Sequence, residues 1–140
     1  MGSGTQAFVV DASVSAAWFL PDEATPFTEA ALAATAQGDV WVPALWLLEI
    51  GNLLVNVQRR RRIDGPQRLA LIAAADALRL RVDREPVALR SIDALADRHR
   101  LSSYDAAYLE LAVRRQLPLA TLDAALLAAM SVEGVLAPAF

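Results

Sequence analysis

The sequence predicts an α/β fold in which a central parallel sheet is covered by helices on both faces. Short, wholly apolar runs typical of strands alternate with longer segments of helical periodicity along the 140 residues. Strands that are apolar on both sides are typical of sheets with both faces covered. Because parallel strands need a crossover connection, usually a helix, this alternation favours a parallel sheet.

Proline and glycine residues mark most of the predicted helix ends. Pro21 breaks a short helix after the first strand, because proline removes a backbone donor from a helix. Gly38 suits the left-handed conformation just past a helix end, whereas Pro43 and Pro66 suit first helical turns. In chain order, the predicted elements are a strand at 7–11, a short helix ending before residue 21, a helix at 27–38, a strand at 40–42, a helix at 43–60, a helix at 66–80, a strand at 80–82, a helix at 87–100, a helix at 103–115, a strand at 117–123, a short helix, and a last strand near 134–137.

The composition limits the domain organisation and excludes several chemistries. We expect one domain at residues 7–140, after an N-terminal tail at residues 1–6 that is partly vector-derived. The absence of lysine excludes a P-loop and a Schiff-base enzyme, and the absence of cysteine excludes disulfides and thiolate metal sites. The net charge of -3 indicates no particular partner. With no signal-peptide pattern and no uncharged span, we expect a cytoplasmic protein with no membrane partner.

Four acids stand in apolar surroundings, where an unpaired charge is costly. Asp11 and Asp123 directly follow predicted strands, at the sheet edge where α/β folds form their sites. Glu49 lies in the middle of an apolar helical pattern, and Asp105 borders the apolar stripe of LSSYDAAYLELA. Converging carboxylates without lysine or cysteine are hard oxygen ligands, so together these acids predict a Mg²⁺ or Mn²⁺ site.

Three of the acids also have a purely structural interpretation. Asp11 and Asp123 can cap the helices that follow them, since aspartate is a favoured N-cap residue. Asp105 can belong to a capping box that begins at Ser102, although the third position prefers Glu or Gln. The sequence alone leaves capping and chemistry open for each of them.

Glu49 and His99 also have interpretations that involve no chemistry. Glu49, Asn52 and Asn56 lie on the same helical face. The polar stripe that they form can simply reach solvent. His99, the one histidine, stands among charged neighbours and off the apolar stripe. We interpret His99 as a surface residue near a helix end and not as a ligand.

Four motifs, in order and over most of the chain, resemble those of PIN-domain proteins and, among them, the VapC-type toxins of toxin–antitoxin modules. The motifs are VVDASVSAAWFL, LLEIGNLL, LSSYDAAYLELA and LATLDAALL. The resemblance implies a three-layer α/β/α sandwich and a Mg²⁺- or Mn²⁺-dependent endoribonuclease that uses metal-activated water. It places the catalytic and metal-binding acids of the family at Asp11, Glu49, Asp105 and Asp123, and accessory polar residues at Ser13, Asn52 and Thr121.

The resemblance also implies partners. These are an RNA substrate, a cognate antitoxin protein, a second copy of the chain in a homodimer, and a toxin–antitoxin hetero-oligomer. A run of four arginines is interpreted either as a solvated helix end or as a contact with RNA phosphates, and its members are Arg59, Arg60, Arg61 and Arg62.

Alternative functions remain open at this stage. They are a PIN-fold RNA-processing nuclease without an antitoxin and a non-catalytic PIN-like binding module. A haloacid-dehalogenase phosphatase or a receiver domain also places an acid after its first strand. The phosphatase pattern requires a second aspartate where this chain has Ser13, and a receiver domain requires a lysine, which is absent.

Overall fold

Four short strands form one parallel sheet in the computed structural model, which describes residues 6–140. The sheet order is β3-β2-β1-β4, and every neighbouring pair is parallel. All three residues of β1 are buried, because helices cover this inner strand from both faces. The strands are β1 (Phe8–Val10), β2 (Val40–Pro43), β3 (Leu80–Asp83) and β4 (Leu119–Ala120).

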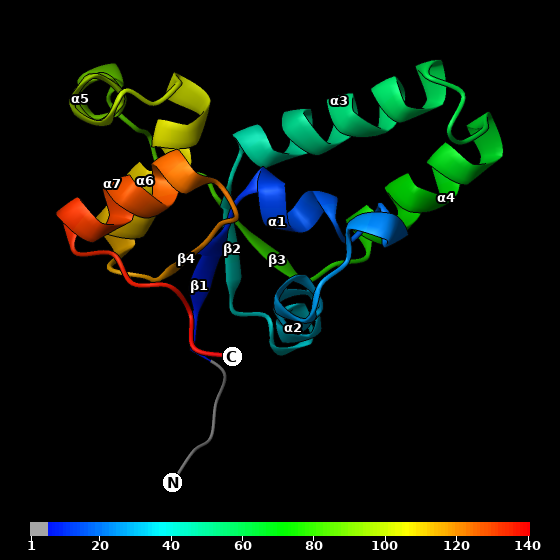
Figure 1. Cartoon of the computed structure of the whole chain (residues 1–140), viewed down its shortest axis with the longest axis horizontal. Helices are drawn as coiled ribbons and strands as arrows, with labels where there is room; N and C mark the ends of the chain where they lie inside the picture. Colours follow the sequence, from blue (N-terminus) through cyan, green and yellow to red (C-terminus); the bar gives the residue numbers. More distant parts are fainter. Residues whose placement is uncertain (1–5) are drawn as a thin grey trace, which may run out of the picture.

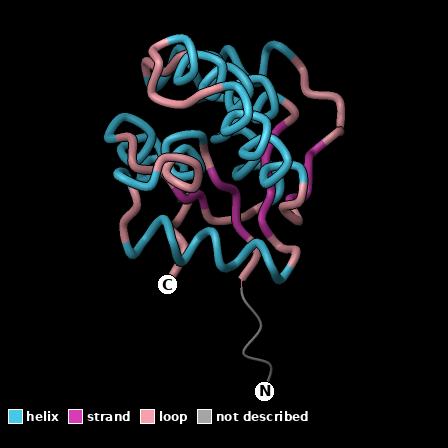
Figure 2. The backbone as a smooth tube through the Cα atoms, turned by 90° about the vertical axis from the view of Figure 1, so that its right-hand side faces the viewer, coloured by secondary structure: helices cyan, strands magenta, loops and turns pink. Residues whose placement is uncertain are grey.

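Seven α-helices of residues 6–140 flank this sheet. They are α1 (Ala12–Ala16), α2 (Pro26–Ala34), α3 (Leu45–Arg59), α4 (Gly65–Asp76), α5 (Leu89–His99), α6 (Ser103–Arg115) and α7 (Ala124–Glu133), with short 3₁₀ turns η1 (Pro21–Glu23) and η2 (Thr35–Gln37). Figure 1 shows α5, α6 and α7 on one side of the strands and α1 to α4 on the other. In the perpendicular view of Figure 2, the strands again lie between helices. The predicted three-layer α/β/α fold is confirmed.

Helices α3 and α6 pack on the sheet through one buried face each. In α3, Trp46 and Leu54 are buried, whereas Leu48 is 74% exposed. In α6, the fully buried Ala106 and Ala112 let the helix backbone approach β1 and β2 closely. Burial of these faces fixes both helices against the sheet, and each of the two carries one of the four acids near its N-terminal end.

Most predicted helix ends are confirmed, but the role of Pro43 is not. Gly38 adopts the predicted left-handed conformation, with φ of 77°. Pro43 ends β2 opposite Asp83 instead of opening the next helix, and α3 begins at Leu45. Proline has no backbone N–H, so it is tolerated at the end of a strand as well as in a first helical turn.

The predicted last strand near 134–137 does not form within residues 6–140. The segment lies beside β4, because the Leu119 N–H donates a 3.0 Å hydrogen bond to the Leu136 carbonyl. Pro138 has no N–H with which to extend this single bond into a ladder. The predicted strand at 117–123 is accordingly reduced to the two residues of β4.

The predicted N-terminal tail falls almost entirely on residues 1–5, which lie outside the described part of the chain. From residue 6 onward, no helix is both long enough and apolar enough to cross a membrane.

Candidate active site

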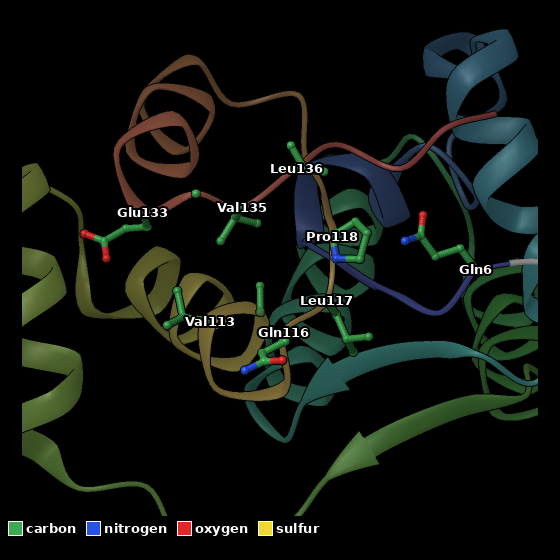
Figure 3. A pocket seen from close by; sticks show the side chains of 10 residues that line it. Gln6, Val113, Gln116, Leu117, Pro118, Glu133, Val135 and Leu136 are labelled. Atoms are coloured by element: carbon green, nitrogen blue, oxygen red, sulfur yellow. The ribbon is translucent and has the colours of Figure 1, made fainter.

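The four acids follow or overlie the carboxyl ends of the strands, at one edge of the sheet. Asp11 follows β1 directly, and Asp123 follows the adjacent β4. A pocket lined by Gln6, Pro118 and Leu136 opens at the opposite edge, where β1 and β4 begin (Figure 3). That pocket contains none of the four acids, so the candidate chemistry belongs to the carboxyl edge.

Asp11 is a buried carboxylate held by neutral donors on both of its oxygens. Oδ1 accepts the Ser13 hydroxyl at 2.6 Å and the Val14 N–H at 3.1 Å, and Oδ2 accepts the Thr121 hydroxyl at 2.5 Å. The residue is 2% exposed, and burial raises the pKa of its carboxyl while the two hydroxyls partly offset that rise. Asp11 therefore caps α1, as one interpretation expected, and still has lone pairs for a further ligand.

Ser13 and Thr121 attach the loop after β4 to the start of α1. Each hydroxyl donates to Asp11 and accepts a backbone N–H from this loop, Leu122 N–H to Ser13 at 2.9 Å and Asp123 N–H to Thr121 at 3.0 Å. These two accessory residues thus connect the segments that carry Asp11 and Asp123. The side chain of Asp11 cannot rotate without breaking both connections.

Asp123 is partly buried and caps helix α7. Its Oδ2 accepts the Leu126 N–H at 2.9 Å. A carboxylate at a helix N-terminus interacts favourably with the helix dipole. One oxygen of Asp123 therefore remains without a hydrogen bond within residues 6–140.

Glu49 lies on α3 and is half-buried. Its Oε1 accepts a hydrogen bond from the Tyr108 hydroxyl of α6 at 2.5 Å. Burial raises the pKa of the Glu49 carboxyl, and the charges of Asp105 and Asp11 raise it further, against the lowering effect of the Tyr108 hydrogen bond. The polar stripe does reach solvent at the exposed Asn52, but Glu49 itself is half-buried and bound to Tyr108.

Asp105 stands in the first turn of α6, which Ser102 caps through a 3.1 Å hydrogen bond to the Asp105 N–H. Within residues 6–140, only this half of the predicted capping box is formed. Burial and the neighbouring Asp123 raise the pKa of the Asp105 carboxyl. The cap is thus made by Ser102, and the Asp105 carboxylate faces other acids.

The four acids form one electrostatic group, called here the acidic site. The charge of Asp105 raises the pKa of Asp11 and of Glu49, and the charge of Asp123 raises the pKa of Asp105. Asp105 is therefore the neighbour that the other three share. None of the ion pairs between residues 6 and 140 includes any of these acids.

The acidic site fits a hydrated divalent cation better than a closed metal cage. Among residues 6–140, no three acid or histidine side chains are close enough together to ligate one ion directly. Mg²⁺ usually keeps several waters and takes only one or two carboxylates, with substrate phosphates completing its shell. Acids that repel one another and lack a cationic partner within residues 6–140 match this requirement, and Asp11, Glu49, Asp105 and Asp123 are the residues that would hold such an ion, directly or through water.

A second buried carboxylate at the same sheet edge shows the opposite chemistry. Asp83 ends β3, and its oxygens bind Arg114 at 2.7 Å and Arg115 at 2.8 Å. Burial alone would raise the pKa of Asp83, but the two guanidinium groups lower it below the ordinary value of 3.8. Asp83 is therefore neutralised by protein cations and belongs to a structural ion-pair network.

The interpretation of His99 as a surface residue is wrong. Its side chain is 7% exposed, and its Nε2 lies 2.6 Å from Glu133. His99 is the last residue of α5 and Glu133 the last of α7, so this contact joins the two helices. Arg98 of α5 also binds Glu133. His99 takes no part in the acidic site and serves to pack two helices together.

The remaining predicted site residues lie along α3. Asn52 is exposed one turn after Glu49, and within residues 6–140 it forms no hydrogen bond to the acidic site. The arginine run at 59–62 is exposed at the tip of the α3–α4 helical hairpin, which projects from the sheet in Figure 1. One member, Arg62, forms a solvent-exposed ion pair with Asp22 at 3.2 Å.

Sequence reasoning missed one residue that contacts the acidic site. The helical pattern places Tyr108 only in the apolar stripe of α6, yet its hydroxyl binds Glu49. A usable signal was present, because Tyr108 follows Asp105 by three residues and so shares its helical face. The spacing could not show that α3 lies opposite this face of α6 and brings Glu49 to the Tyr108 hydroxyl.

Comparison with known proteins identifies the family and supports the fold. The PIN domain family matches residues 8–131 of the chain, a range that includes all four acids. The crystal structure of PAE2754 from Pyrobaculum aerophilum is similar, with 24% sequence identity and a TM-score of 0.65, over 91% of this chain and 87% of that one. At this identity, the likeness supports the fold alone. No curated protein matches the sequence.

The family match and the structure point to the same assignment. The match spans most of the chain, and the parallel sheet between two layers of helices agrees with it. The acids at the carboxyl edge supply the oxygen ligands that a divalent metal requires. The chain therefore belongs to the PIN-domain family, whose members are generally nucleases that use divalent metal ions.

Proposed function

We propose that this protein is a Mg²⁺- or Mn²⁺-dependent endoribonuclease whose acidic site hydrolyses RNA phosphodiester bonds. The observation that carries the proposal is that hydrogen bonds bring the segments of Asp11, Glu49, Asp105 and Asp123 together, and that none of these acids has a cationic partner within residues 6–140. Such a group of charges is costly in a folded protein unless a cation is bound. Family membership supports nuclease chemistry, and the choice of RNA follows from the resemblance to VapC-type proteins.

Each residue of the acidic site has a defined task in this proposal. A bound divalent ion supplies an acidified water and offsets the charge that develops on the phosphoryl oxygens. Asp11, held by two hydroxyls, gives a rigid ligand, and Asp105 and Asp123 complete the anionic surroundings. Glu49 has a raised pKa, which suits a carboxylate that orients the attacking water and accepts its proton.

The reaction needs no nucleophilic side chain. The water oxygen bonds to phosphorus, the bond from phosphorus to the 3′ oxygen breaks, and the leaving oxygen takes up a proton. The products are a 5′-phosphate and a 3′-hydroxyl end. These ends distinguish the proposal from attack by the RNA 2′-hydroxyl, which leaves a cyclic or 3′ phosphate.

The arginine run is proposed as a contact for the RNA backbone. Arg59 follows Glu49 by ten residues on one helix, which corresponds to about 15 Å along the axis. An exposed cluster of positive charge at that distance can bind phosphates on the same strand that enters the acidic site. It would also offset the repulsion between RNA and four carboxylates.

We further propose that the protein acts in the cytoplasm as the toxin of a toxin–antitoxin pair, as a homodimer that binds its antitoxin. The resemblance of all four motifs to VapC-type toxins supports this role. Leu48 and Leu122 are 74% and 50% exposed, and they directly precede Glu49 and Asp123. In this proposal, Leu48 and Leu122 belong to the surface that the antitoxin covers.

Replacing Asp105 by asparagine tests the acidic site directly. Asp105→Asn should lower Mn²⁺-dependent RNA cleavage by about 100-fold, because it removes one of the negative charges that hold the divalent ion. Mn²⁺ should stabilise the wild type against unfolding by about 2.7 kcal/mol at a hundred times its Kd, and the variant far less. The control is Asp97→Asn, the same change at an exposed position of α5. Wild-type cleavage by Asp105→Asn would remove this residue from the site.

The raised pKa values predict how metal-free stability depends on pH. Asp105 ionises less readily in the folded than in the unfolded chain, so its charge destabilises the fold above the raised pKa and not below the ordinary value of 3.8. In EDTA, Asp105→Asn should therefore have a larger free energy of unfolding than the wild type at pH 7. This difference should disappear as the pH falls below 3.8.

Urea denaturation at several pH values measures this difference. The ion pairs of Asp83 and Glu133 depend on pH in the opposite sense, but they are present in both proteins and cancel. A wild type more stable than Asp105→Asn at pH 7 without metal would contradict the mutual repulsion of the four acids.

Replacing two arginines tests the proposed RNA contact. In the inactive Asp105→Asn background, Arg59→Gln with Arg60→Gln should weaken RNA binding at low salt. The slope of log K against log salt should fall by about 0.7 for each phosphate that the arginines no longer neutralise. The control, Arg84→Gln with Arg90→Gln, removes the same charge from exposed positions elsewhere. Equal affinities and equal slopes for the two double variants would exclude the arginine run from the interface.

The toxin role predicts growth arrest when the protein is produced in bacterial cells. Wild-type protein should stop growth, and Asp105→Asn should not, because arrest depends on RNA cleavage. The cognate antitoxin, expected from a small open reading frame beside the gene, should restore growth when it is co-produced and should co-purify with the nuclease. If wild type and Asp105→Asn cells grow equally while the purified wild type cleaves RNA, the protein is an RNA-processing nuclease and not a toxin.

A further inference from the structure

A buried tyrosine hydroxyl joins the two helices that carry Glu49 and Asp105. Tyr108 is 1% exposed, and its hydroxyl donates a 2.5 Å hydrogen bond to Oε1 of Glu49. The partners lie on α6 and α3, 59 residues apart in sequence. Phenylalanine would fill the same space in the core, so the hydroxyl must be explained by what it binds.

The Tyr108 hydroxyl can only be a donor in this contact. A phenol ordinarily loses its proton only at about pH 10. The phenol therefore keeps its proton, and an ionised carboxylate has only acceptor positions. The bond thus holds one defined oxygen of Glu49, and its charge-assisted character makes it stronger than a neutral hydrogen bond.

A second buried bond fixes α3 one turn earlier. Trp46 Nε1 donates to the Ser15 hydroxyl at 2.8 Å, and Ser15 donates to the backbone carbonyl of Asp11 at 2.8 Å. Trp46 and Glu49 are three residues apart, so α3 is attached to the Asp11 segment at one point and to α6 at the next. The first bond places the helix, and the second places the carboxylate.

We propose that Tyr108 is the positioning residue of the acidic site, holding Oε1 of Glu49 so that its second oxygen is available to a divalent ion or to an ion-bound water. Within residues 6–140 that second oxygen has no hydrogen-bond partner. The inference rests on the proposed metal-dependent function and adds a residue to it. Partners of this kind orient the groups that ligate a metal, and their loss typically costs about 10- to 100-fold in metal affinity or activity.

The chain provides a matched pair of tyrosines for the test. Tyr108→Phe removes the hydroxyl and keeps the ring, whereas Tyr104→Phe makes the same change one turn earlier at a side chain that is 61% exposed. In Tyr108→Phe, the Mn²⁺ concentration that gives half-maximal cleavage should rise about 10-fold or more. The concentration that gives half of the Mn²⁺-induced rise in Tm should rise by the same factor. Tyr104→Phe should match the wild type in both.

A merely structural tyrosine gives a different result. Tyr108→Phe would then lower the metal-free Tm and leave both Mn²⁺ concentrations unchanged, which would overturn the proposal. A cycle with Glu49→Ala adds a second criterion, because Tyr108 acts through Glu49 and its loss should have no further effect on Mn²⁺ dependence in that background. A wild type that shows neither cleavage nor stabilisation by Mn²⁺ would instead reject the proposed function itself.

A spectroscopic test avoids any folding defect of Tyr108→Phe. The chain has two tyrosines, so Tyr104→Phe protein labelled with fluorotyrosine carries a single ¹⁹F signal, at Tyr108. Titration with Mg²⁺, which is diamagnetic, should shift this signal and saturate at the concentrations that raise Tm. An unshifted signal at Mg²⁺ concentrations that fully stabilise the protein would overturn the assignment of Tyr108.

Discussion

The mutual repulsion of four carboxylates at one edge of the sheet is the constraint around which the site is built. Every hydrogen bond that the structure gives to Asp11 and Glu49 comes from a neutral donor, such as Thr121 or Tyr108. Neutral donors stabilise a carboxylate without cancelling its charge. The fold therefore orders these side chains while leaving the negative potential intact, as binding of a divalent ion requires.

Two acids outside the acidic site are paired with cationic side chains. Asp83 is bound by two arginines, and Glu133 is bound by Arg98 and by His99, with a lowered pKa in both cases. These pairs link helices to strands or to one another and contribute to stability. The contrast within one small domain separates the carboxylates that need an external cation from those that already have one.

A capping role does not exclude a chemical role for the same carboxylate. Asp11 and Asp123 cap α1 and α7, yet each lies in the acidic site. This is possible because a carboxylate has about four acceptor positions and a cap uses only one or two of them. A capped helix start also holds the side chain in one rotamer, which spares the entropy cost of ordering it when a ligand binds.

The sequence by itself determined the order of the seven helices and four strands, the bounds of α6 and the four acids as candidates, although it also predicted a last strand that does not form within residues 6–140. These depend on periodicity, on local caps such as Ser102, and on the types of residue present. Only the tertiary structure decided the strand order, the end of β2 at Pro43, the burial of His99 and the bond from Tyr108 to Glu49. Such contacts arise where crossovers bring distant segments together, and no short-range pattern encodes which helix faces which.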